Sequence, residues 1–364
     1  MKPFKPETVL IERKVKKLPK TQEILTRVNP GRIELIDDIT QTVAENSFSP
    51  EENILVLAKQ EGKFFKPCPC TPSHVTCGYY FLNLATNCTV GCSYCILQGY
   101  LNNPLMTVYT NVEDMFQELD KLTSNSDKFY RIGTGELTDS LLLDSITGFS
   151  SMLMDYFREK RNCVLELKTK TAEIARLVSY KSVPSNIVIS WSLNPLELIQ
   201  TDEPFGASLD ERLSAAARCE KAGYNISFHF DPIIPLPGWE EKYRLTVEKM
   251  FKAVSPNKIV WISLGVLRYP GFMHALLKEK HPQSMIFSGE MFPGQDGKMR
   301  FFRPFRQEVF KKMLGWIHDL SPKTWVYLCM ESADVWKSVY GETFSRGCSL
   351  VKGMDESVKM QLKL

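Results

Sequence analysis

The chain has 364 residues, a length that one large α/β domain or two smaller domains can fill. Hydrophobic residues make up 43% of it and charged residues 24%, proportions that exclude a wholly disordered, collagen-like or coiled-coil protein. The net charge is only +3, so any surface for nucleic acid has to be a local patch. No apolar run is long enough to span a membrane, and residues 1–20 lack the apolar stretch of a signal peptide. We therefore expect a cytoplasmic protein with no membrane partner.

Residues 1–77 predict an N-terminal extension with a short buried strand at 53–58 and a Pro- and Cys-rich loop at 66–72. From residue 79 onward, short apolar runs alternate with longer segments of helical period, a pattern typical of βαβ units and a parallel sheet. Six strands are too few to close an eight-stranded barrel, so the sequence predicts an α/β fold with a partial (β/α)6 TIM-type barrel over residues 78–284. The predicted strands are 79–85, 128–133, 163–168, 186–192, 225–231 and 258–264, and the predicted helices are 111–124, 140–160, 171–180, 208–222, 239–254 and 270–280.

Residues 285–364 predict a C-terminal region of one hairpin followed by helices. Two strands, 285–291 and 299–305, flank a segment whose Pro-Gly and Asp-Gly pairs favour a turn. Basic side chains on and after the hairpin are candidates for phosphate contacts with nucleic acid. The alternative is an exposed edge hairpin that charge protects from aggregation. The candidates are Lys298, Arg300, Arg303 and Arg306.

Six of the ten cysteines crowd into 28 residues, and three of these directly follow the first predicted barrel strand as a C-x3-C-x2-C motif. Three adjacent thiolates can hold three corners of a cubic iron-sulfur cluster and leave the fourth iron open. A zinc site is the alternative, with His74 and Cys77 as candidate further ligands. The six are Cys68, Cys70, Cys77, Cys88, Cys92 and Cys95. The other four, which we expect to be buried apolar side chains, are Cys163, Cys219, Cys329 and Cys348.

The motif with Tyr94 before its third cysteine, at the end of the first strand of a (β/α)6 pattern, resembles the radical S-adenosylmethionine (SAM) enzymes. That resemblance implies a 4Fe-4S cluster held by Cys88, Cys92 and Cys95. It also implies that the open iron chelates SAM and that the reduced cluster cleaves SAM to a 5′-deoxyadenosyl radical. In many members a Gly-Gly-Glu segment follows the second strand, and Gly133, Gly135 and Glu136 stand there in this chain.

A narrower resemblance, over about residues 79–250, is to the spore photoproduct lyase family of DNA repair enzymes. It rests on the order of several short matches: the string Ala85–Gln98, Val108–Val112, Thr169-Lys170, Ser192-x-Asn194, 209–216, 222–224, 232–233 and 238–241. The resemblance implies that the radical abstracts hydrogen from a cross-linked thymine dimer, whose methylene bridge then breaks. It also implies that Lys170, Ser192 and Asn194 lie at the SAM site, and that Tyr94 is the first of two tyrosines that relay a hydrogen atom.

The chain departs from that family at two positions of one pathway. Ile96 stands where the second tyrosine is expected, and Glu136 stands at or near the cysteine that quenches the product radical. Glu136 is instead assigned to the amino group of SAM, with an ordinary loop carboxylate as the alternative. The nearest unassigned thiol, Cys77, becomes the candidate hydrogen donor. Its alternatives are a structural role or an accessory metal site with Cys68, Cys70 and His74.

Two functions remain open from the sequence. The first is a radical SAM lyase that splits thymine photodimers in DNA. The second is a radical SAM enzyme on a small molecule, a peptide or an RNA base, which the missing relay residues favour. In either case we expect a monomer that receives electrons from a donor such as flavodoxin or ferredoxin.

Overall fold

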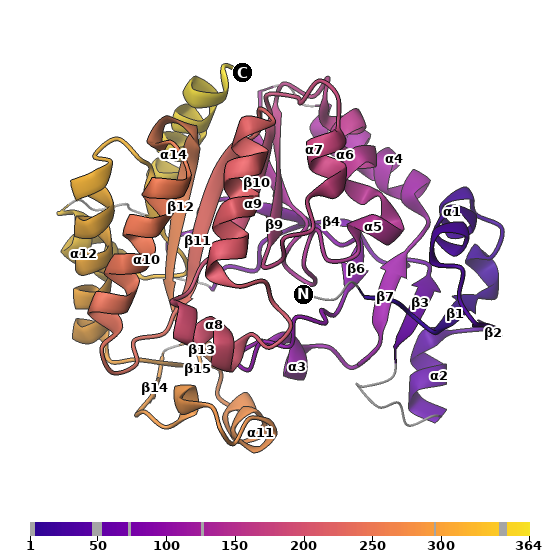
Figure 1. The fold of residues 1–364 in the computed structure, drawn as a ribbon, viewed down its shortest axis with the longest axis horizontal. Helices are drawn as coiled ribbons and strands as arrows, with labels where there is room; N and C mark the ends of the chain where they lie inside the picture. Colours follow the sequence, from indigo (N-terminus) through magenta and orange to yellow (C-terminus); the bar gives the residue numbers. More distant parts are fainter. Residues whose placement is uncertain (1–3, 46–52, 72–73, 125–126, 295, 342–347) are drawn as a thin grey trace.

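The computed structural model describes the chain except residues 1–3, 46–52, 72–73, 125–126, 295 and 342–347. Its largest sheet has eight strands in the order β16-β12-β11-β10-β9-β8-β5-β4, and all neighbours are parallel except the pair β4–β5. The six predicted barrel strands lie side by side in it, so the partial barrel is confirmed (Figure 1). Its strands are β4 (Phe65–Pro67), β5 (Tyr80–Leu82), β8 (Tyr130–Gly133), β9 (Cys163–Thr169), β10 (Ile187–Ser192), β11 (Asn225–Ile233), β12 (Ile259–Val266) and β16 (Val326–Leu328).

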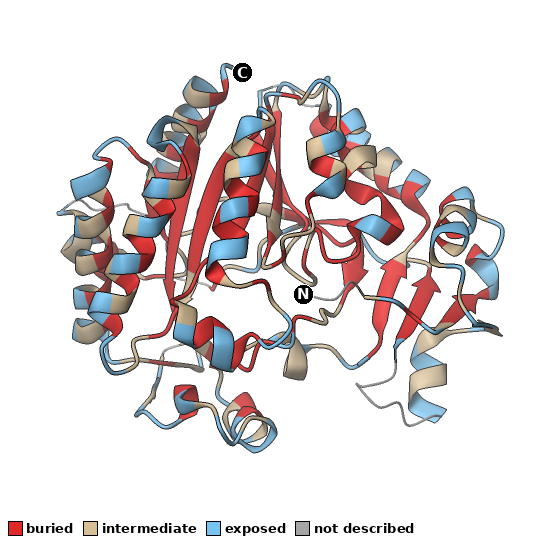
Figure 2. Cartoon of the chain, viewed as in Figure 1, coloured by how far each residue is buried: buried red, intermediate tan, exposed pale blue. Residues whose placement is uncertain are grey.

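Helices cover the outer face of this sheet and turn their apolar sides toward it, as the buried stripes in Figure 2 show. Helix α9 starts where Ser208 and Glu211 form a reciprocal capping box, which satisfies backbone N–H groups that the first turn leaves free. The covering helices are α4 (Val112–Thr123), α5 (Asp144–Thr147), α6 (Phe149–Phe157), α7 (Ala175–Ser179), α9 (Leu209–Lys221), α10 (Trp239–Ala253), α12 (Arg303–Leu320), α13 (Ala333–Tyr340) and α14 (Cys348–Leu362). Helix α8 (Leu196–Asp202) follows β10 and lies at the lower edge of the sheet in Figure 1.

The N-terminal extension contributes to a second sheet of order β2-β1-β3-β7-β6, seen on the right of Figure 1. Of its strands, only β3 was predicted as a strand of the extension. Strand β7 comes from after the cysteine motif, and β4 of the extension pairs with β5, so strand pairing crosses the expected boundary at residues 77/78. Strand β16, in the expected C-terminal region, pairs with β12 of the large sheet, so strand pairing also crosses the expected boundary at 284/285. The strands are β1 (Thr8–Glu12), β2 (Arg32–Ile36), β3 (Ile54–Ala58), β6 (Ala85–Thr86) and β7 (Met106–Tyr109).

Two predicted elements are divided in the structure. The run 79–85 begins as β5 in the large sheet and ends as β6 in the N-terminal sheet, so the cysteine motif follows the point where the chain passes from one sheet to the other. The predicted helix 140–160 is broken into α5 and α6 at Gly148. The φ angle of that glycine is 64°, in the left-handed region that favours glycine and ends helices.

The hairpin is shorter than predicted. Its strands are β14 (Phe292–Pro293) and β15 (Lys298–Arg300), and β13 (Arg268–Pro270) pairs with β15 to make a three-stranded sheet. The expected strand 285–291 is wrong, because residues 285–287 form the 3-10 helix η3. The strand expected at 299–305 ends early, because α12 starts with Pro304 in its first turn. The remaining elements are η1 (Arg13–Val15), α1 (Pro19–Val28), α2 (Ile39–Glu45), α3 (Leu97–Tyr100), η2 (Pro256–Lys258) and α11 (Met273–Lys280). Within the described ranges, no helix has both the length and the apolar character to cross a bilayer.

Candidate active site

The three motif cysteines lie on the loop between β6 and α3. They are Cys88, Cys92 and Cys95. Asn87 fixes the start of this loop, because its side-chain amide donates to the carbonyl oxygens of Asn103 and Leu105, both at 2.7 Å. Gly91 turns the loop with a φ of 69°, and a Cβ there would lie 3.1 Å from the Phe205 ring. The loop is therefore held in shape by residues outside the motif.

The thiols of the loop form a soft donor set beside a cation. Burial raises the pKa of all three, that of Cys92 to about 12, and the ammonium group of Lys170 opposes the rise at Cys92 and Cys95. Among the described residues, no three His, Cys, Asp or Glu side chains converge as ligands of a single metal ion. A cubic cluster needs no such convergence, since each thiolate ligates its own corner iron. Three thiols from one loop thus fit an iron-sulfur cluster better than zinc.

Tyr94 is buried next to Glu203, whose carboxylate accepts hydrogen bonds from several side chains. Its hydroxyl donates to Glu203, and the Asn194 amide donates to the Tyr94 oxygen at 3.1 Å and to Glu203 at 2.9 Å. Arg212 donates to the other carboxylate oxygen of Glu203 and, at 2.9 Å, to the backbone oxygen of Ser192. The structure therefore brings Tyr94, Asn194 and the backbone of Ser192 together around Glu203, and the expected contacts of Ser192 and Asn194 with SAM stay predictions. It adds Glu203, which the sequence analysis did not single out.

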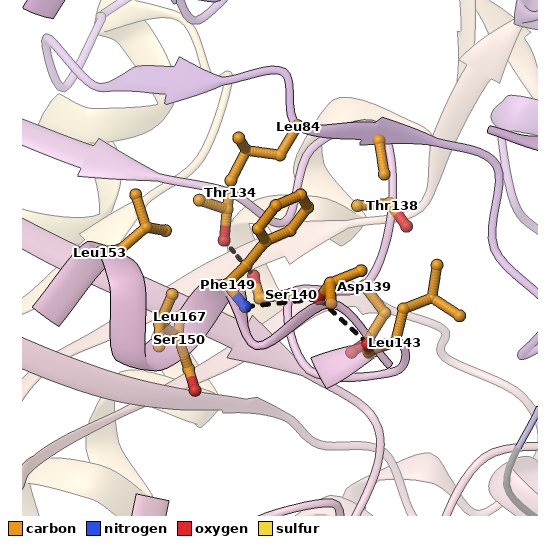
Figure 3. Close-up of a pocket in the computed structure, with 12 residues that line it drawn as sticks. Leu84, Thr134, Thr138, Asp139, Ser140, Leu143, Phe149, Ser150, Leu153 and Leu167 are labelled. Atoms are coloured by element: carbon orange, nitrogen blue, oxygen red, sulfur yellow. Dashed lines mark hydrogen bonds between the residues drawn. The ribbon is translucent and has the colours of Figure 1, made fainter. Parts of the chain in front are cut away.

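Lys170 is placed by Asp139, which accepts hydrogen bonds from the Lys170 backbone N–H at 2.7 Å and from the Thr169 hydroxyl at 2.8 Å. Asp139 also accepts from the backbone N–H of Leu141 at 2.9 Å, so it ties two strand-end loops together. Figure 3 shows it on the wall of a cavity of about 20 Å³, enough for one water molecule. The buried hydroxyl of Thr138 lines the same cavity without a protein partner.

The glycine segment after β8 is close to side chains of the sheet interior. A Cβ at Gly133 would overlap the Tyr79 hydroxyl, and one at Gly135 would lie 3.0 Å from the Cβ of Lys168. Glu136 accepts from the Lys168 ammonium at 2.7 Å, with 29% of the Glu136 side chain exposed. In the structure these glycines make room for Tyr79 and Lys168. Their contact with SAM stays a prediction.

A second buried carboxylate, Glu166 on β9, lies inside the curled sheet. It accepts from the hydroxyls of Tyr79 and Ser190 and contacts the His229 ring nitrogen at 2.7 Å. Burial raises its pKa, but His229 and Lys168 outweigh burial, and the pKa lies well below its usual range. One sequence signal points to this carboxylate: Glu166 and Lys168 alternate with apolar residues in the strand 163–169, whose other residues are buried.

Cys77 lies between the Cys-rich loop at 66–72 and strand β5. Burial raises the pKa of the Cys68 and Cys70 thiols, and the charge of Cys77 acts in the same direction. The described residues contain no single-ion metal site, so the accessory metal alternative gains no support. Cys163 and Cys219 are fully buried as predicted. Cys329 is only half-buried, and the Cys348 side chain lies outside the described part of the chain.

Two of the four predicted phosphate contacts are wrong, because their guanidinium groups are buried and already paired. Arg300 donates to Asp296 at 2.6 Å, and Arg306 donates to both carboxylate oxygens of Glu331, at 2.8 and 3.1 Å. Lys298 is partly covered and donates to Thr71 at 2.9 Å. Arg303, with 59% of its side chain exposed, remains available to a phosphate.

Comparison with known proteins gives one consistent result. A family model described as "Spore photoproduct lyase" matches residues 4–291. The spore photoproduct lyase of Bacillus subtilis (strain 168) is 27% identical over 262 residues, which cover 69% of this chain and 75% of that protein. The spore photoproduct lyase of Geobacillus sp. (strain Y412MC61) is 26% identical over 254 residues, which cover 67% and 72% respectively.

Solved structures of spore photoproduct lyase share the fold. One complexed with dinucleoside spore photoproduct has a TM-score of 0.79 at 22% identity, covering 90% of this chain and all of that one. A double mutant with bound AdoMet and dinucleoside spore photoproduct gives a TM-score of 0.79 at 21% identity, with the same coverage. At this level of identity the match establishes the fold alone.

Proposed function

Because the chain belongs to the spore photoproduct lyase family, we propose that it is a radical SAM lyase that splits a methylene-bridged thymine dimer in DNA. The observation that carries the proposal is the loop of Cys88, Cys92 and Cys95 beside the partial barrel, with Cys92 buried and the other two partly buried. The cluster and SAM, when bound, supply a carbon-centred radical that abstracts hydrogen from the substrate. The residues of this chain hold these groups, exclude water and position the substrate.

The proposed SAM site lies where the loops after β8, β9 and β10 meet the cysteine loop. Lys170 offers a partly buried positive charge for the carboxylate of SAM. Burial lowers the pKa of Lys170, but Cys92 and Glu203 outweigh burial and raise it. Glu136 offers a carboxylate for the amino group of SAM. The Asn194 oxygen accepts from Tyr243 at 2.8 Å and its amide serves Tyr94 and Glu203, so Asn194 orients Tyr94 rather than offering free polar atoms.

The proposed DNA contact is on the hairpin side of the molecule. Arg303 is exposed at the start of α12, and the exposed rings of Phe292 and Phe302 lie 5.8 Å apart between centroids. An apolar pair beside a cation suits a lesion that leaves the base stack, because rings fill the gap while the cation neutralises phosphate. Electron delivery by a flavodoxin or ferredoxin, and a monomeric state, belong to the same proposal.

A radical SAM enzyme on a different substrate is the second candidate. Two observations favour it. Ile96 and Glu136 stand in place of the relay residues, and the burial of Arg300 and Arg306 leaves fewer exposed cations for DNA than the sequence suggested.

Anaerobic turnover distinguishes the two candidates. The reconstituted protein is incubated with SAM, reductant and either dinucleotide spore photoproduct or lesion-containing DNA, and 5′-deoxyadenosine and thymine are both quantified. The proposal expects substrate-dependent formation of thymine, which a Cys92→Ala variant does not give. 5′-Deoxyadenosine without dimer consumption would favour the second candidate.

A further inference from the structure

Three cationic side chains share one face of the small sheet that contains the hairpin. Strands β13 and β15 pair antiparallel, with Arg268 directly opposite Arg300. Lys298 is two residues before Arg300 on β15, so its side chain lies on the same face. Like charges directly opposite each other destabilise a sheet. This arrangement therefore needs negative charge to compensate it.

The three cations converge on Met330. Its sulfur accepts from the Arg268 Nε at 3.4 Å and from the Lys298 Nζ at 3.9 Å, and its backbone oxygen accepts from the Arg300 guanidinium at 3.4 Å. A thioether is a weak acceptor, so two charged donors point at an atom that satisfies neither of them well. The φ angle of Met330 is 53°, which a residue other than glycine rarely adopts. Strain of this kind is concentrated at functional sites, and here it coincides with the two weakly satisfied donors.

Carboxylates compensate only part of the positive charge. Asp231 contacts Arg268 at 3.2 Å, and Asp296 contacts Arg300 at 2.6 Å and Lys298 at 3.8 Å. These ion pairs join three cations to two carboxylates, which leaves one positive charge in excess. Burial lowers the pKa of Lys298, and Arg268 and Arg300 lower it further, against the effect of Asp296. An anion bound here would therefore stabilise the charge of Lys298.

The group is accessible to solvent and lies at the active-site edge of the large sheet. The exposed fraction is 26% for the Lys298 side chain and 12% for the Arg268 side chain. Asp231 stands near the end of β11 and Arg268 two residues after β12, and the hairpin lies below these strand ends in Figure 1. The proposed SAM site lies at the ends of β8, β9 and β10, which are parallel to β11 and β12. The two sites therefore share one edge of the sheet.

We propose that Arg268 and Lys298 bind the phosphodiester group that joins the two nucleotides of the dimer. The inference rests on the proposed function for its substrate. A phosphodiester carries one negative charge, which equals the excess positive charge of the group. Its oxygens accept charge-assisted hydrogen bonds from the two donors that otherwise contact the Met330 sulfur, and the flexible Met330 side chain moves aside. Arg303, which is far more exposed, suits the flanking phosphates of longer DNA.

Two dimers that differ only in the phosphodiester test the site without turnover. The full-length, cluster-loaded protein is titrated with SAM present and reductant absent, either with dinucleotide spore photoproduct or with the dinucleoside form, which lacks the phosphodiester. We expect the wild type to bind the dinucleotide about 10- to 100-fold more tightly, the scale of hydrogen bonds to a charged group. Lys298→Met and Arg268→Gln should abolish most of this preference and leave the affinity for the dinucleoside unchanged.

Lys312→Met is the matched control, because Lys312 is also partly exposed but forms its ion pairs with Glu240 and Glu308, outside the group. It should keep the preference for the dinucleotide, as should Lys298→Arg, which retains the charge. Thermal midpoints show whether each variant is folded. If Arg268→Gln does not fold because Asp231 loses its partner, Lys298→Met decides the test.

A preference for the dinucleotide that persists in folded Lys298→Met would overturn the phosphodiester site, and so would an equal loss of affinity for both dimers. Equal binding of both dimers by the wild type would also overturn it, and inorganic phosphate binding that is lost in Lys298→Met would then assign the group to free phosphate. A wild type that binds neither dimer contradicts the proposed function, and the phosphodiester assignment falls with it.

Discussion

The hydroxyl of Tyr94 donates a hydrogen bond to the carboxylate of Glu203, and both side chains are buried. Glu203 is also the counter-charge of Arg212, which is wholly buried. Tyr94, which precedes the third cysteine of the motif, is therefore held by the ion pair of Glu203 with Arg212. Glu203 is the first residue after α8. The cysteine loop and the loop after α8 form one structural unit.

Replacing Glu203 by Gln should destabilise this unit. The change leaves the Arg212 guanidinium buried without a counter-charge, and breaking a buried pair costs about 3–5 kcal/mol. Denaturant unfolding of the purified variants measures the loss. Tyr94→Phe removes the hydrogen bonds of the Tyr94 hydroxyl with Glu203 and Asn194 but keeps the ion pair, so it should cost less, about 1.5–3 kcal/mol. The exposed Glu197→Gln is the control, and equal stability of Glu203→Gln and this control would show that the pair does not hold the loop.

The iron content should depend on each motif cysteine. Anaerobic reconstitution of the wild type should give about four irons and four sulfides per chain, the composition of a cubic cluster. Alanine at Cys88, Cys92 or Cys95 should abolish this content, while the buried Cys163→Ala should retain it. Iron analysis with the visible spectrum measures both. A full cluster and SAM cleavage in any one of the three variants would remove that cysteine from the ligand set.

Glu136→Gln should weaken SAM binding by about 1–3 kcal/mol, the scale of a hydrogen bond to a charged group. Because Glu136 also pairs with Lys168, the thermal midpoint has to be measured alongside the SAM dissociation constant. Lower affinity with an intact cluster supports the contact. A lower thermal midpoint with unchanged SAM affinity would mean that Glu136 only forms its ion pair with Lys168 and does not contact SAM.

The six barrel strands and the cysteine loop were predictable because each rests on local signals: short apolar runs, and three thiols within eight residues. Strands β1 and β2 were missed. Strand β2 is the edge of its sheet and has no buried residue, so it lacks the apolar run of a buried strand, and β1 is a short run that pairs with β2 and β3. The division of residues 79–85 between two sheets is a long-range choice.

Side-chain partners were the least predictable part of the site. Arg300 looked like a surface cation on a hairpin, and its burial depends on Asp296 in the turn and on a backbone oxygen after β16. Glu203 carries no motif of its own and acquires its role only when α8 brings it to Tyr94. The burial of Arg300 and the role of Glu203 both depend on tertiary packing, which a local sequence pattern does not reveal.

Arg303 and Arg300 should respond differently to charge reversal. Arg303→Glu should weaken DNA binding for all sequences and reduce the slope of log K against log salt by about 1, because one phosphate contact is lost. Arg300→Glu should instead lower stability, since it places a carboxylate against buried Asp296. Salt titrations of DNA affinity and unfolding curves separate the two effects. Absence of any salt-dependent DNA binding by the wild type would contradict the DNA substrate.

The contact between Asp296 and Arg300 should make hairpin docking dependent on pH. Burial raises the pKa of Asp296, but Arg300 and the Thr71 hydroxyl outweigh burial, so the folded-state pKa lies below its ordinary value of 3.8. A group with a lowered folded-state pKa stabilises the fold fully above its unfolded pKa, and that contribution is lost as the pH falls through the folded pKa.

Asp296→Asn should therefore lower the free energy of unfolding at pH 7 by about 1.5–3 kcal/mol, the value of hydrogen bonds to a charged group. The difference from the wild type should shrink as the pH falls below 3.8, because the wild-type carboxyl is then protonated in the unfolded chain and its advantage disappears. Urea unfolding at a series of pH values from 7 to 3 measures this difference in the free energy of unfolding.

Asp334, whose side chain is 78% exposed and pairs with Arg303 at 3.5 Å, provides the control. Asp334→Asn should stay within about 0.5 kcal/mol of the wild type at every pH, as surface pairs do. A constant difference between Asp296→Asn and the wild type down to pH 3 would show that Asp296 acts through its shape in the turn rather than through its charge.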